Sequence, residues 1–145
     1  MFKHILLPTD GSPLSEAAIQ VGMQLAKSIG ARVTGLYVTA PYRLLRGGKE
    51  SMADTKEQYE KDSSARAQRF LAAISSLGKE LSVTCDCISE TVNHPYEGIV
   101  GAAEKRGCDL IVMASHGRHG VQALLALNET DKVLAHTKIP VLVFR

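Results

Sequence analysis

Residues 109–145 read DLIVMASHGRHGVQALLALNETDKVLAHTKIPVLVFR, and their pattern decides the fold. Asp109 is followed by an apolar run ending at Ala114, which is typical of a central parallel strand covered on both faces. A loop containing two glycines follows, then a helix predicted to end near His136 and a final strand over 139–144. A strand, a helix and another strand in this order predict a right-handed crossover between parallel strands.

The same alternation extends back to the start of the chain. Ser12 caps a helix that begins at Pro13 and ends at Gly30, and a third helix lies between Pro95 and Gly107. A long helix is predicted between these two, over 51–77, closed by Gly78. The remaining strands are predicted over 3–7, 32–38 and 81–89, the last an edge strand because its apolar residues alternate with polar ones. Five strands alternating with helices predict an open α/β fold with a parallel sheet, formed as a single domain over 1–145.

Composition narrows the class of protein. The chain has 145 residues, 45% of them hydrophobic, which is enough for one well-packed core. The net charge of +2 argues against nucleic acid or an anionic membrane as the main partner. The first apolar run is too short for a signal peptide, and no segment is apolar for long enough to cross a bilayer, so we expect a cytoplasmic protein.

The three cysteines do not form a disulfide framework. Cys85 and Cys87 are two residues apart in a predicted strand, so their side chains share one face and their backbones lie too far apart for an unstrained disulfide. We interpret them as small core residues and expect no metal site.

A ligand site is expected where the strand order of the sheet reverses. The first and fourth strands, both strongly apolar, are the natural central neighbours, and they end at Asp10 and in the loop after Met113. No P-loop and no dinucleotide-binding glycine motif is present. A catalytic triad of Ser115, His116 and Asp10 is not expected, because adjacent residues on an extended chain point apart and no G-x-S-x-G turn frames the serine.

Three segments together resemble the universal stress protein family: ILLPTDGSPLSEAAI (5–19), DLIVMASHGRHG (109–120) and ETDKVLAHTKIPVLVFR (129–145). The resemblance implies a three-layer open sandwich whose five-stranded parallel sheet has the order 3-2-1-4-5, with helices on both faces. It also implies a dimer, since members of the family are usually dimeric. Some members bind ATP and others do not, and the family has no established general reaction.

The ATP-binding members share the pattern G-x-x-G, nine residues, G-[STN], and this chain keeps half of it. Gly117 and Asn128 match the pattern, whereas Ala114 and Leu127 replace glycines. Leu127 is the larger obstacle, because a glycine can adopt positive φ and lets phosphate oxygens approach the backbone N–H groups. We therefore expect ATP or another adenine nucleotide to bind weakly or not at all.

By resemblance, the residues of an adenine-nucleotide site lie at three places along the chain. They are Pro8, Thr9, Asp10 and Val38 at the ends of the first two strands, Met113, Ala114, His116, Gly117 and Arg118 after the fourth strand, and Asn128, Glu129 and Thr130 at the start of the last helix. Several of them have a simpler interpretation: Asp10 as a turn residue, Val38 and Met113 as core, the loop as solvated, and Asn128 as a helix cap with Asp131 at the capping-box position.

The sequence thus predicts a small regulatory and binding module in the stress response, not an enzyme. We expect a homodimer formed through the C-terminal strand 139–144, and a regulatory protein partner that the sequence does not identify. Two alternatives remain open. One is an interaction module of the same fold that works without nucleotide, and the other is an ATP-hydrolysing or phosphate-transferring enzyme of the related adenine-nucleotide α/β group.

Overall fold

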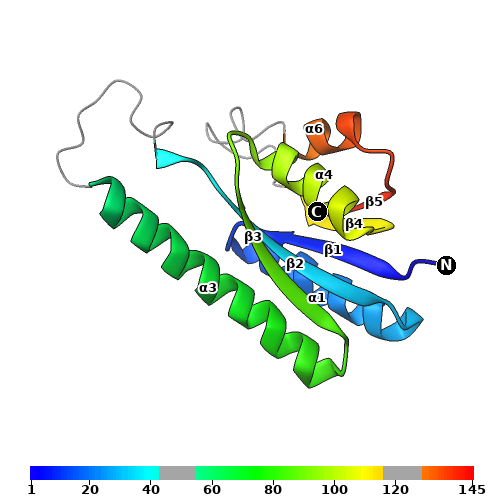
Figure 1. Ribbon diagram of the computed structural model, residues 1–145. Helices are drawn as coiled ribbons and strands as arrows, with labels where there is room; N and C mark the ends of the chain where they lie inside the picture. Colours follow the sequence, from blue (N-terminus) through cyan, green and yellow to red (C-terminus); the bar gives the residue numbers. More distant parts are fainter. Residues whose placement is uncertain (43–54, 116–128) are drawn as a thin grey trace.

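A computed structural model describes residues 1–42, 55–115 and 129–145. In these residues five parallel strands form one sheet in the order β3-β2-β1-β4-β5, as predicted (Figure 1). The elements in chain order are β1 (His4–Thr9), α1 (Pro13–Ile29), β2 (Arg32–Thr39), α3 (Lys56–Leu81), β3 (Cys85–Thr91), α4 (Pro95–Arg106), β4 (Leu110–Ala114), α6 (Glu129–His136) and β5 (Val141–Phe144).

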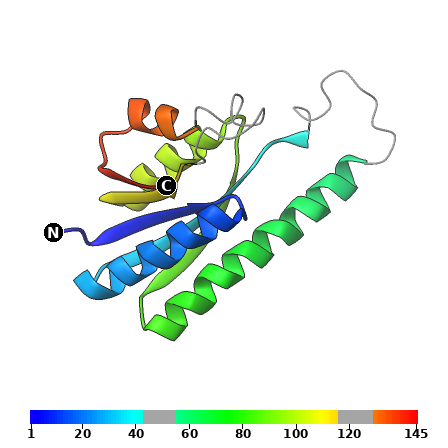
Figure 2. The same ribbon diagram turned by 180° about the vertical axis from the view of Figure 1, so that it is seen from behind.

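Helices cover both faces of the sheet, which gives three layers (Figures 1 and 2). Helices α1 and α3 pack on one face over a core that includes Ile5, Leu7 and Val33, and α4 and α6 pack on the other over a core that includes Leu6 and Leu36. Neighbouring strand residues point to opposite faces, so the continuous apolar runs of β1 and β4 supply both cores at once. No described helix is long and apolar enough to span a membrane.

The predicted ends of the first helix are confirmed. The Ser12 side chain accepts a hydrogen bond from the backbone N–H of Ser15, Pro13 occupies the first turn, and Gly30 ends α1 at φ 70°. Likewise α4 begins at Pro95 and is ended by Gly107 at φ 69°. Both glycines adopt the left-handed conformation that favours glycine after a helix.

The prediction that Gly78 ends the long helix is wrong. Helix α3 continues through it to Leu81 and is ended by Ser82, whose φ is 58°. Gly78 is buried, and a Cβ on it would lie 2.7 Å from the Cβ of Cys85, so a glycine is needed there for close packing of α3 against β3. The predicted start of this helix at residue 51 lies outside the described residues, and its described part begins at Lys56.

The strands also differ from prediction at their ends. The third strand covers Cys85–Thr91 and not 81–89, because the chain needs Ser82 to Thr84 to turn back from α3. The last strand begins at Val141, two residues later than predicted. The interpretation of the two cysteines holds: Cys85 and Cys87 are unbridged, lie half-buried on β3 and pack against the α1–α3 core.

Candidate functional site

The strand order reverses between β1 and β4. From β1 the chain moves outward to β2 and β3 on one side, and later to β4 and β5 on the other. Ile5 pairs with Leu110 and Leu6 with Ile111, so the carboxyl ends of these two central strands lie at the same edge of the sheet. Ligands bind at such a point in open α/β folds, because the connections there leave in opposite directions and open a crevice. The predicted position of the site is therefore present in the fold.

The turn after β1 is built by its own side chains. The hydroxyl of Thr9 is buried, 2.8 Å from the hydroxyl of Ser15, and accepts a hydrogen bond of 3.0 Å from the N–H of Gly11. Exposed Asp10 accepts a hydrogen bond of 2.9 Å from the N–H of Ser12 through Oδ1. The Thr9 hydroxyl thus stabilises the turn from inside the protein. The Asp10 carboxylate also stabilises the turn, through its bond to Ser12, but it is exposed to solvent. Pro8 is buried in the strand before them.

Val38 and Met113 share the core between the sheet and α4. Met113 is 5% exposed, and half-buried Val38 packs against the same cluster. Gly98 of α4 lies directly over Val38, since a Cβ on it would be 2.9 Å from a Val38 methyl. The simpler interpretation of both as core residues is supported by this packing.

The start of α6 is attached to the two neighbouring elements. The hydroxyl of Thr130 lies 3.5 Å from the carbonyl oxygen of Ala114, at the end of β4. The Glu129 carboxylate accepts a hydrogen bond of 2.7 Å from the N–H of Tyr96 in α4 and lies 3.6 Å from Lys132 Nζ. Thr130 thus meets the end of β4, whereas Glu129 contacts α4, and both side chains are engaged within the protein.

Four of the predicted site residues lie outside the described residues: His116, Gly117, Arg118 and Asn128. The same holds for Leu127. Within the part of the chain that is described, no group of three or more His, Cys, Asp and Glu side chains is placed to hold a metal ion.

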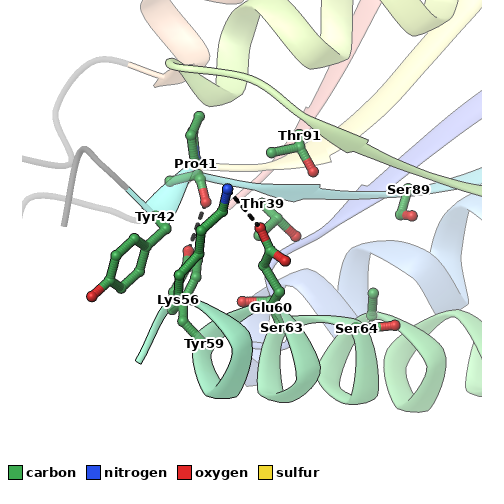
Figure 3. Close-up of a pocket in the computed structure, with 12 residues that line it drawn as sticks. Thr39, Pro41, Tyr42, Lys56, Tyr59, Glu60, Ser63, Ser64, Ser89 and Thr91 are labelled. Carbon is green, nitrogen blue, oxygen red and sulfur yellow. Dashed lines mark hydrogen bonds and ion pairs between the residues drawn. The ribbon is translucent and has the colours of Figure 1, made fainter. Parts of the chain in front are cut away.

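One polar cavity was not predicted from the sequence (Figure 3). It has a volume of about 590 Å³ and lies between the carboxyl ends of β2 and β3 and the first turns of α3. We call it the polar groove. It is lined by Thr39, Ala40, Pro41, Tyr42, Lys56, Tyr59, Glu60, Ser63, Ser64, Ala67, Ser89 and Thr91. The sequence signal for it is the repeat of polar residues at helical spacing in α3 (56, 60, 63), a pattern that is equally typical of a solvated helix face.

Three hydrogen-bonded polar side chains, His4, Thr34 and Asp86, cross the other end of the sheet, and the first two are buried. The hydroxyl of Thr34 donates to Asp86 Oδ1 at 2.8 Å and lies 2.8 Å from His4 Nε2. A carboxylate only accepts, so Thr34 must accept from His4, and this fixes the proton of the neutral ring on Nε2. Burial, and then the nearby charge of Arg32, lower the pKa of His4.

Comparison with known proteins identifies the family of this chain. The sequence pattern of the universal stress protein family matches residues 1–145. The chain belongs to this family. A universal stress protein of Thermus aquaticus is 30% identical over 145 residues, covering all of both chains. The similarity of this chain to the Thermus protein therefore extends from one end of the fold to the other.

Solved structures show the same architecture. The structure of MJ0577, a universal stress protein of Methanocaldococcus jannaschii, matches with a TM-score of 0.81 at 26% identity, covering 99% of this chain and 96% of that one. A universal stress protein solved in complex with cAMP matches with a TM-score of 0.75 at 17% identity, covering 99% and 97% of the two chains. At that identity the second match shows the fold alone.

Proposed function

We propose that this universal stress protein is a regulatory binding module that holds an adenine nucleotide weakly at the carboxyl ends of β1 and β4. The observation that carries the proposal is the reversal of strand order between these two strands, with the exposed Asp10 carboxylate at that edge. A carboxylate placed there can accept hydrogen bonds from the two hydroxyls of a ribose.

Two further features support an adenine nucleotide as the ligand class. A member of the same fold has been solved with cAMP, so the architecture accommodates an adenosine group. The chain also keeps Gly117 and Asn128 of the family's ATP-binding pattern. We expect binding to be weak because Leu127 replaces a glycine of that pattern, and a glycine would let phosphate oxygens reach backbone N–H groups.

We propose regulation, and not catalysis, as the role of this site. The turn after β1 offers Thr9 and Asp10, and the Thr9 hydroxyl is buried and already bonded to its own turn. A phosphate-transferring enzyme is the competing function. Steady release of phosphate from ATP and magnesium, lost in a His116→Ala variant, would favour it.

We further propose a homodimer in which two copies of β5 pair antiparallel. β5 is the last strand of the sheet, and its Leu142 is 37% exposed. An open edge strand with an exposed apolar side chain favours association with another strand. In such a dimer, a protein partner could contact both copies and distinguish the nucleotide-bound form from the free form.

The simplest test of nucleotide binding is to identify any small molecule that co-purifies with the protein. The purified protein is denatured, and the released small molecules are separated on an ion-exchange column and compared with AMP, ADP and ATP standards. We expect a substoichiometric amount of adenine nucleotide, in keeping with weak binding. If none is released and calorimetry with ATP and AMP shows no heat of binding at millimolar ligand, the nucleotide-independent interaction module becomes the better description.

A further inference from the structure

We propose that the polar groove is a second binding site, for a neutral polyhydroxylated molecule such as a disaccharide or a cyclic polyol. It lies on the opposite face of the sheet from the proposed adenine contacts. Gly35 of β2 faces Ile74 of α3, since a Cβ on it would be 2.9 Å from an Ile74 methyl. Thr39, four residues further along the same strand, shares that face. Val38, by contrast, faces α4.

The groove gathers side-chain hydroxyls from three elements. Thr39 pairs with Thr91 in the β2–β3 register and Tyr37 with Ser89, so Thr39, Ser89 and Thr91 all face α3. Ser64 adds a hydroxyl from the helix (Figure 3). Within the described residues, none of these four hydroxyls has a hydrogen-bond partner in the protein. Each can donate one hydrogen bond and accept two, which suits a ligand carrying several hydroxyls.

The charges of the groove favour a neutral ligand. Lys56, the one lysine among the described residues that line the groove, lies 3.8 Å from Glu60, so the two charges offset each other, and both side chains are mostly exposed. Among the described lining residues, a phosphate group would meet one cation, and that cation is already paired with a carboxylate. Phosphate sites normally combine unpaired cations with backbone N–H donors, so an anionic ligand is disfavoured here.

Two tyrosines supply an apolar wall. The rings of Tyr42 and Tyr59 are 5.6 Å apart, and Tyr59 is held in place by a hydrogen bond of 2.6 Å from its hydroxyl to the Ala40 carbonyl oxygen. A fixed aromatic ring can pack against the C–H face of a sugar while the hydroxyls opposite bind its O–H groups. The volume of about 590 Å³ is within the usual range for small-molecule sites.

The test uses the full-length protein with trehalose and myo-inositol as probes, measured by saturation-transfer NMR and titration. Thr39→Val and Thr91→Val each remove one hydroxyl but keep a β-branched residue that suits a strand. We expect each to weaken binding about threefold to tenfold, as for loss of one neutral hydrogen bond. Thr84→Val is the matched control, because Thr84 is exposed just before β3 and outside the groove. It should leave the affinity unchanged.

Excess ATP should not displace the probes, and Asp10→Ala should not change their affinity, if the two sites are separate. Three results would overturn the proposal. The first is no saturation transfer to either probe at tens of millimolar with the protein folded, and the second is an equal effect of Thr84→Val. The third is binding that is abolished by Lys56→Met but insensitive to Thr39→Val and Thr91→Val, which would indicate an anion site.

Discussion

The carboxylate of Glu129, the first residue of α6, caps the first turn of α4 by accepting a hydrogen bond of 2.7 Å from the N–H of Tyr96. Helix α4 has no cap of its own, because the His94 side chain at its N-cap position makes no capping bond. One helix thus satisfies a free N–H group of another, and a negative charge is placed at the positive end of α4. This contact ties the segment that follows the proposed nucleotide loop to the neighbouring helix α4.

Glu129→Ala should therefore destabilise the protein by about 1–2 kcal/mol, the usual cost of losing an N-cap acceptor. Glu129→Gln keeps an acceptor oxygen and should lose less. Urea unfolding followed by circular dichroism measures both changes, with Glu104→Ala, an exposed position in α4, as the control. If Glu129→Ala is as stable as the control, water must replace the carboxylate as the hydrogen-bond acceptor of the Tyr96 N–H.

Protonation of His4 should destabilise the fold. Burial lowers the pKa of this ring in the folded protein, so the unfolded chain binds a proton more readily. The stabilising contribution of the neutral ring is fully present above its unfolded pKa of about 6.5 and is lost as the pH falls from there through the folded pKa.

The measurement is the free energy of unfolding of the wild type and of His4→Gln between pH 5 and 8. The comparison isolates His4, because the chain's four other histidines are the same in both proteins. The wild type should lose more stability than the variant below pH 6.5. Parallel curves, or an NMR titration that gives His4 a pKa at or above 6.5, would contradict the account.

Leu142→Lys should weaken the proposed dimer, because it places a charge on the exposed side of the edge strand β5. Val141 is a poorer choice for this test, since it packs against the protein's own α4–α6 core. Val21→Lys, at a position of α1 that is 42% exposed, is the matched control. Analytical ultracentrifugation should show a dimer for the wild type and the control. A monomeric wild type at micromolar concentration would remove the claim.

Asp10→Ala should weaken nucleotide binding at least about tenfold, as expected for the loss of a charged hydrogen bond. The substitution also removes the bond to the Ser12 N–H, so Asp10→Asn serves as the comparison: its amide oxygen can keep the turn bond while the charge is lost. Both variants are titrated with AMP by calorimetry. Unchanged affinity in both would place the ribose elsewhere and leave Asp10 with its turn role alone.

The fold could be predicted from the sequence because each element carried its own signal. The apolar runs of β1 and β4 and the caps at Ser12 and Gly107 depend on neighbours close in the chain. Gly78 misled the prediction because its role depends on the distant Cys85, which approaches too closely for any side chain. Ser82 ends the helix instead, in a conformation that serine seldom adopts.

The site could be predicted only in part, for the same reason. The carboxyl ends of β1 and β4 follow from the order of elements. The polar groove does not, because Thr39 and Thr91 are brought together by the pairing of β2 with β3 across the long α3 connection. No local pattern around either threonine distinguishes it from an ordinary strand end.

The central claim is that this chain retains the position of the family's nucleotide site but holds ATP weakly because of Leu127. Calorimetry of ATP binding to the wild type, Leu127→Gly and the double variant Leu127→Gly/Ala114→Gly tests it most directly. The account predicts weak or undetectable binding by the wild type, a clear gain from the single change, and a smaller further gain from the second. Tight ATP binding by the unmodified protein, or no gain in a double variant that remains folded, would contradict it.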